Sequence, residues 1–125
     1  MVLLASCGEY QQVLKSRDPD YKFQKALEYF NLKEYGKAQT LFDDVAAYYK
    51  GTERSEDVLC YIARSHMGQK SYSEAADYYA AYIRNYPKGK YIIEARFQEG
   101  HCYYLDSPEP VVIMRITGYA RMLLP

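Results

Sequence analysis

The sequence predicts an all-α solenoid of stacked helical hairpins, with about five helices in about two and a half repeats. Small and aromatic residues recur every 37 positions, and a third copy begins at Gly100 and Tyr103. The two full copies are Ala26, Tyr29, Tyr35, Ala38 and Phe42, then Ala63, His66, Tyr72, Ala75 and Tyr79. Small residues let two helices approach closely and aromatic rings fill the space beside them. This pattern is typical of repeats that bury their apolar faces only against neighbouring repeats.

Composition and charge favour one domain that binds other proteins. The chain has 125 residues with 16 basic and 16 acidic side chains, so no basic field favours nucleic acid. It contains 16 tyrosines, whose rings fill space between helices while their hydroxyls need a partner or water. The sequence has no run of 18 or more apolar residues, so we expect no membrane-spanning helix.

The first hairpin is expected from residue 18 to residue 50. Asp18 can accept hydrogen bonds from the free amides of a first helical turn, and Pro19 suits the first helical position. Apolar residues then recur at helical spacing to about Lys33. After a tight link at 34–36, a second helix carries one apolar face made of Ala38, Leu41, Phe42, Val45 and Tyr49.

The second hairpin follows the loop at Gly51 and Thr52. Its first helix carries Val58, Leu59, Ile62, Ala63 and His66. We expect it to end at Gly68 as a left-handed cap. Ser71 and Glu74 have the spacing of a capping box, which predicts the start of the next helix.

That fourth helix carries Ala75, Tyr78, Tyr79, Tyr82 and Tyr86, and residues 87–89 end it. A fifth helix is expected from about Lys90 to Leu105. Two prolines, at 108 and 110, then interrupt the helical pattern, because proline lacks an amide donor and disfavours helix in the preceding residue.

Two family resemblances follow from these residues. The repeats resemble tetratricopeptide repeats, although they are slightly longer than the usual 34 residues. Several local strings are also similar to the BamD (YfiO) family of outer-membrane assembly lipoproteins, in particular to forms from Bacteroidetes-like bacteria. These are Leu4-Ala5-Ser6-Cys7, which looks like a lipobox, Tyr21-Lys22-Phe23, Arg64-Ser65-His66 and Tyr86-Pro87-Lys88-Gly89.

The resemblance to this family implies a non-enzymatic scaffold without a cofactor or a small-molecule substrate. Its partners would be the subunits of the barrel assembly machinery and unfolded outer-membrane proteins. The resemblance also implies a position at the periplasmic face of the outer membrane, held by a lipid on Cys7. Because only six residues precede Cys7 and none is basic, we expect a longer signal segment or a fragment here.

Three segments are expected from this organisation. Residues 1–17 form a lipoprotein signal remnant and tether, and residues 18–110 form the repeat domain. Residues 111–125 contain no acidic residue and do not continue the register of the repeat. We interpret them as a non-family tail from a frameshifted or truncated reading frame, or as a native apolar tail that caps the open end.

A peptide-binding groove is the remaining candidate site. The first helix of each hairpin is expected to line the concave face, where its outward residues are Lys22, Tyr29, Arg64 and Arg96. Tyrosine and arginine can hydrogen-bond and stack on an extended peptide, and arginine can hold a terminal carboxylate. The alternative is that these are ordinary solvated or internally paired residues.

No catalytic or metal-binding motif is found. The two histidines lack the HxxxH and HExxH spacings, and no phosphate-binding glycine loop is present. Cys60 and Cys102 are expected to be buried free thiols, with a disulfide between them left open. Two other functions stay open: a general repeat-containing envelope lipoprotein of cell division or pilus assembly, and a cytoplasmic repeat adaptor.

Overall fold

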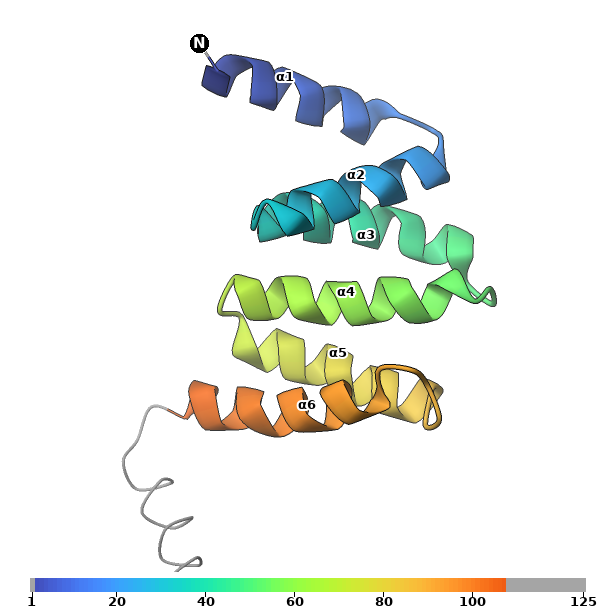
Figure 1. Cartoon of the computed structure of the whole chain (residues 1–125), viewed down its shortest axis with the longest axis vertical. Coiled ribbons are helices and arrows are strands. Elements are labelled where there is room, and N and C mark those ends of the chain that lie inside the picture. Colours follow the sequence, from blue (N-terminus) through green and yellow to red (C-terminus); the bar gives the residue numbers. More distant parts are fainter. Residues whose placement is uncertain (1, 108–125) are drawn as a thin grey trace, which may run out of the picture.

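The computed structural model describes residues 2–107, with side chains from residue 8 onward. This range contains six helices and no strand: α1 (Val2–Lys15), α2 (Pro19–Asn31), α3 (Tyr35–Tyr49), α4 (Arg54–Gly68), α5 (Tyr72–Asn85) and α6 (Ile92–Asp106). Figure 1 shows these helices as a stack, in which α2 with α3 and α4 with α5 form successive hairpins. Within this range no helix is long and apolar enough to cross a membrane.

The predicted repeat is confirmed by burial of the small residues. The small residues of the repeat are fully buried: Ala26 and Ala38 in the first hairpin, and Ala63 and Ala75 in the second. Aromatic rings fill the space around them: the Phe23 ring, for example, contacts Phe42 and Tyr49 of α3 edge to face. His66 takes the place of Tyr29 in the second hairpin. It stacks on Tyr78, with the ring centres 5.1 Å apart.

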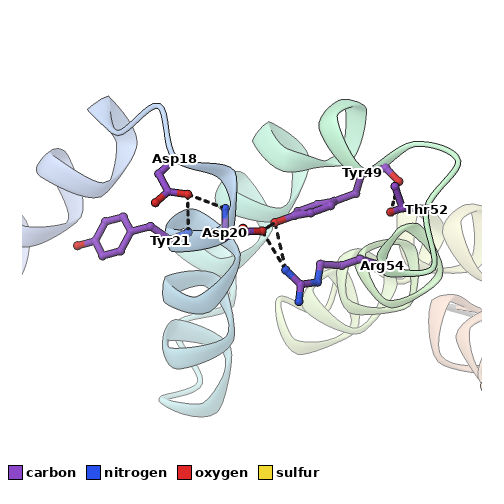
Figure 2. A network of polar contacts seen from close by, with 6 residues as sticks. All are labelled: Asp18, Asp20, Tyr21, Tyr49, Thr52 and Arg54. Atoms are coloured by element: carbon purple, nitrogen blue, oxygen red, sulfur yellow. Dashed lines mark hydrogen bonds and ion pairs between the residues drawn. The ribbon is translucent and has the colours of Figure 1, made fainter.

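The predicted start of α2 is also confirmed. Pro19 is the first residue of the helix, and Asp18 precedes it with extended backbone. The Asp18 carboxylate accepts hydrogen bonds from the amides of Asp20 at 3.1 Å and Tyr21 at 3.3 Å (Figure 2). Two of the amides that the helix cannot satisfy internally are thereby paired.

The turn within each hairpin differs from the expectation. Gly68 is not a left-handed cap but the last residue of α4, and the left-handed residue is Lys70, at φ 62°. Lys33 holds the same place in the first hairpin, at φ 63°. Gly68 is needed for a different reason: a Cβ there would lie 2.3 Å from the Tyr35 ring.

The prediction of a capping box at Ser71 and Glu74 is wrong. Ser71 precedes α5, but its side chain makes no capping hydrogen bond. The Ser71 amide instead donates to the His66 carbonyl at 2.9 Å, and the Lys70 amide donates to the Met67 carbonyl at 3.0 Å. These two bonds form a Schellman motif, which ends α4 and occupies the amide that Glu74 would otherwise have capped.

Helix α1 was not among the expected elements. Its second half packs against α2, where Val13 is fully buried and the Tyr10 ring meets the Tyr29 ring edge to face at 5.7 Å. Lys25 adds an ion pair to Glu9 at 2.6 Å. The apolar stripe of this half is only Tyr10, Val13 and Leu14, which is too short to indicate helical periodicity by itself.

Candidate functional site: a cleft at the ends of the hairpins

A cleft of about 580 Å³ opens beside the loop at 50–53, which joins α3 to α4. Its walls come from the first turns of α2 and α4, the last turn of α3 and the segment before α6. The lining residues are Asp20, Tyr48, Tyr49, Thr52, Glu53, Arg54, Asp57 and Lys90. The cleft therefore combines two aromatic rings, two cations and three carboxylates where neighbouring hairpins meet.

Asp20, Tyr49 and Arg54 form the polar network on one wall (Figure 2). The Tyr49 hydroxyl donates to the Asp20 carboxylate. The Arg54 guanidinium lies 3.1 Å from that carboxylate and 3.2 Å from the hydroxyl. Burial raises the pKa of Tyr49 and the bond to Asp20 raises it further, so the hydroxyl stays a neutral donor.

Arg54 is also held by aromatic rings. Its guanidinium lies over the rings of Phe23 and Tyr49, with its carbon 4.6 Å and 5.2 Å from their centres. An arginine fixed by a carboxylate and two rings loses little further freedom when it meets a ligand. This wall of the cleft is therefore preorganised.

A related network occurs one hairpin further along. Asp57, 37 residues after Asp20, accepts hydrogen bonds at 2.7 Å from the Tyr91 hydroxyl and the Lys90 ammonium. Burial and the bond to Asp57 raise the pKa of Tyr91 to about 12. The hydrogen bond to Asp57 also raises the pKa of Lys90. Both cations of the cleft thus have a carboxylate partner.

Tyr48 is an exposed aromatic side chain at the edge of the cleft. It is 64% exposed and meets the Tyr49 ring edge to face at 5.0 Å. It also borders a second hollow of about 220 Å³, which is lined in addition by Lys22 and Asp44. A ring placed between two hollows can stack on an aromatic side chain of a partner, and its hydroxyl can meet a peptide group.

The four residues expected to line one groove are not brought together. The Lys22 side chain borders the smaller hollow, where its ammonium pairs with Asp44 at 3.1 Å. Tyr29 is buried, so it presents little surface to a partner. Arg64 is paired with Glu94, and Arg96 is exposed on α6.

Sequence reasoning missed Tyr48 and the network around it. Tyr48 stands next to the buried stripe of Leu41, Val45 and Tyr49 but is not part of it, which places its ring on the open side of α3. An aromatic residue one position away from an apolar stripe was the available signal. The expected groove relied only on the first helix of each hairpin, whereas Tyr48 lies on a second helix.

The structure gives the state of two of the three cysteines and the result of a search for metal-binding side chains. Cys60 and Cys102 are buried and free, so they do not pair with each other. Residues 8–107 hold no group of three or more side chains that could bind a metal. Cys7 lies in α1, but its side chain lies outside the described part of the chain.

Stacked helical hairpins with an open cleft define a repeat protein of the tetratricopeptide type, a class whose surfaces hold other proteins. The chain matches the YfiO family, described as outer membrane lipoprotein, over residues 15–121. It therefore belongs to this family of outer membrane lipoproteins, as the local strings of the sequence predicted. No curated protein shows significant similarity to the chain.

The match extends past Pro110, into the segment 111–125 that was expected to be a non-family tail. Residues 111–125 lie outside the described part of the chain. The match begins at residue 15, after Cys7, so it does not test the expected lipidation of Cys7.

Proposed function

We propose that this protein is a non-enzymatic scaffold of the outer-membrane β-barrel assembly machinery. In this proposal it binds partner subunits and extended segments of unfolded barrel proteins, and it is anchored at the periplasmic face by a lipid on Cys7. Membership of the outer membrane lipoprotein family supports the location. The observation that carries the binding role is the exposed Tyr48 ring beside the preorganised Asp20 and Arg54 pair.

The chemistry of the cleft suits an extended polypeptide. An unfolded segment offers unpaired backbone groups and aromatic side chains. Tyr48 can stack on such a ring, and the hydroxyl of Thr52 or the carboxylate of Glu53 can meet peptide groups. Because Arg54 and Lys90 are each paired with an acid, the cleft has no free positive field for a polyanion.

A photo-cross-linking amino acid at position 48 tests the binding role. The matched control is position 85, which is exposed and lies 37 residues later, at the same place in the second hairpin. In living cells, cross-links at 48 to barrel assembly subunits or unfolded barrel proteins, with few at 85, would support the proposal. Equal cross-linking at the two positions, or none at 48, would remove the cleft as the binding site.

Lipidation is tested with a palmitate analogue in the upstream-extended gene product. Cys7→Ala should abolish the label and release the protein from the outer membrane fraction. Cys60→Ala is the matched control and should keep the label, since the Cys60 thiol is buried. Label that survives Cys7→Ala would contradict the anchor and leave the repeat domain with another mode of attachment.

Depletion of the protein separates the proposal from its two alternatives. Loss of barrel-protein insertion is expected for an assembly scaffold. A general envelope lipoprotein of cell division or pilus assembly would instead give a division or pilus defect with normal insertion. A cytoplasmic adaptor would show neither defect and would not fractionate with membranes.

A further inference from the structure

The two hollows that meet at Tyr48 carry opposite net charge. The larger one, of about 580 Å³, is lined by three carboxylates and two cations. The smaller one, of about 220 Å³, is lined by two cations and one carboxylate. Because the exposed Tyr48 ring borders both hollows, a segment that lies across this ring meets a net negative surface in one hollow and a net positive surface in the other.

In the larger hollow, ion pairing leaves the carboxylate of Glu53 without a cation. Arg54 pairs with Asp20, and Lys90 pairs with Asp57. Glu53 is exposed and forms no ion pair within residues 8–107. It directly precedes α4, but its side chain makes no capping hydrogen bond there. The Glu53 carboxylate is therefore open to a cation that comes from a partner.

In the smaller hollow, ion pairing leaves a cation instead. Lys22 pairs with Asp44 at 3.1 Å. Arg17 stands in the link between α1 and α2, is exposed, and forms no ion pair in the part of the chain that the structure describes. A guanidinium can donate two parallel hydrogen bonds to one carboxylate, so the natural ligand of Arg17 is an acidic side chain.

The arrangement of the hollows suits the interior of a polypeptide better than its end. A segment whose aromatic residue stacks on Tyr48 can continue into both hollows, since the ring borders each of them. In an extended chain, every second side chain lies on the same face. The residues two before and two after the aromatic residue therefore face the protein together with it, where they can meet Arg17 and Glu53.

We propose that this surface selects extended segments in which an aromatic residue stands between an acidic and a basic side chain. The aromatic ring stacks on Tyr48, the acidic side chain pairs with Arg17, and the basic side chain pairs with Glu53. This inference rests on the proposed binding role of the cleft and adds a rule of charge order. Both chain directions satisfy the rule, because it concerns side chains and not the backbone.

Four fluorescent peptides with blocked termini test the rule. They share a central phenylalanine and differ only in the residues two before and two after it, which are glutamate and lysine, two glutamates, two lysines or two glutamines. Fluorescence anisotropy at low salt measures their binding to the full chain. The peptide with unlike charges should bind about threefold more tightly than the others or better, because each like-charged peptide gains one attraction and one repulsion. This preference should shrink in 0.5 M salt, a test concentration of roughly the strength that screens exposed charges.

Charge reversals in the protein should change the preferred peptide. Arg17→Glu should favour the peptide with two lysines, and Glu53→Lys should favour the peptide with two glutamates. The double variant should again favour unlike charges, because the segment can bind in the opposite direction. Arg96→Glu and Glu74→Lys are the matched controls: both residues are exposed and line neither hollow, so the order of the wild type should be kept.

The outcomes separate this rule from the binding role of the cleft. Tyr48→Ala should weaken all four peptides to a similar extent. If Tyr48→Ala does so but the four peptides bind equally, or every variant keeps the wild-type preference, the rule is overturned and the binding role stands. If no peptide binds, or Tyr48→Ala changes nothing, both the rule and the binding role of the cleft are overturned.

Discussion

Arg64 of α4 holds Glu94 of α6 through two hydrogen bonds, 2.8 Å from Nε and 2.7 Å from the terminal nitrogen. The guanidinium lies between the rings of Tyr61 and Tyr91, 4.9 Å from each ring centre. This pair joins the first helices of two neighbouring hairpins. A bidentate arginine held between two rings has a fixed geometry, so it sets the spacing of the stack as well as contributing attraction.

Replacing Arg64 by methionine should destabilise the fold by about 1–2 kcal/mol, because the Glu94 carboxylate stays partly buried without its partner. Thermal unfolding followed by circular dichroism measures this. Arg96→Met is the control: Arg96 is exposed on α6, so its loss should change stability by less than about 0.5 kcal/mol. Similar losses of stability in the two variants would mean that the Arg64–Glu94 pair contributes no more to stability than an exposed arginine does.

The Arg64 pair also predicts a pH dependence. Burial opposes ionisation of Glu94, but the hydrogen bonds from Arg64 and Cys60 prevail and hold its pKa below the ordinary value of 4.5. A lowered folded-state pKa contributes stability above the unfolded pKa, and this stability is lost as the pH falls through the folded pKa. The stability difference between wild type and Arg64→Met should therefore be full at pH 7 and shrink below about pH 4.5. A difference that is constant from pH 7 to pH 3 would contradict this.

Gly68→Ala should destabilise the protein although alanine favours helix. The new Cβ would meet the Tyr35 ring at 2.3 Å, and that ring packs on Phe30 and cannot move freely. The strain should exceed the gain in helix propensity of about 1 kcal/mol, for a net loss of about 1–2 kcal/mol in chemical denaturation. Gly100→Ala, with open space around its Cβ, should instead stabilise by about 0.5–1 kcal/mol.

The two helix starts should respond differently to alanine. Asp18→Ala removes two hydrogen bonds to the first turn of α2 and should cost about 1 kcal/mol in thermal unfolding. Ser71→Ala should cost no more than a few tenths of a kcal/mol, because the Ser71 hydroxyl makes no capping bond. Equal costs would indicate that Ser71 caps α5 in solution.

The two buried thiols should react slowly. Burial raises the pKa of both Cys60 and Cys102, so the reactive thiolate is scarce at pH 8. In a Cys7→Ala background, a maleimide should label neither residue within minutes in the folded protein, and should label both in denaturant. Rapid labelling of Cys60 in the folded protein would show that the contact between α4 and α6 opens often.

The hairpins could be predicted from sequence because each interface needs a small residue such as Ala26 or Ala63 and an aromatic beside it. Asp18 and Pro19 act through local backbone chemistry, which a sequence shows directly. The turn at Lys70 could not be predicted so well, since a non-glycine residue accepts φ 62° only because the Schellman bonds impose it.

The candidate site was harder to predict than the fold. Arg64 has the residue type of a ligand-binding side chain, and only its distance to Glu94 reveals that it is occupied. The place of Tyr48 beside the apolar stripe of α3 indicates an exposed ring but not a cleft, because the cleft depends on how the loop at 50–53 brings α4 back beside α3. Sites of this kind depend on contacts between hairpins, which a single repeat does not encode.

Helix α1 bears on how far the repeats stand from a membrane. Its described contacts with α2 come from Glu9, Tyr10 and Val13, all of which follow Cys7. Cleavage before Cys7 would therefore remove none of them. Six residues of helix, about 9 Å, separate Cys7 from Val13. If Cys7 carries the proposed lipid, the spacer is a short helical rod instead of a flexible linker, and the first hairpin is held close to the bilayer in a limited range of orientations.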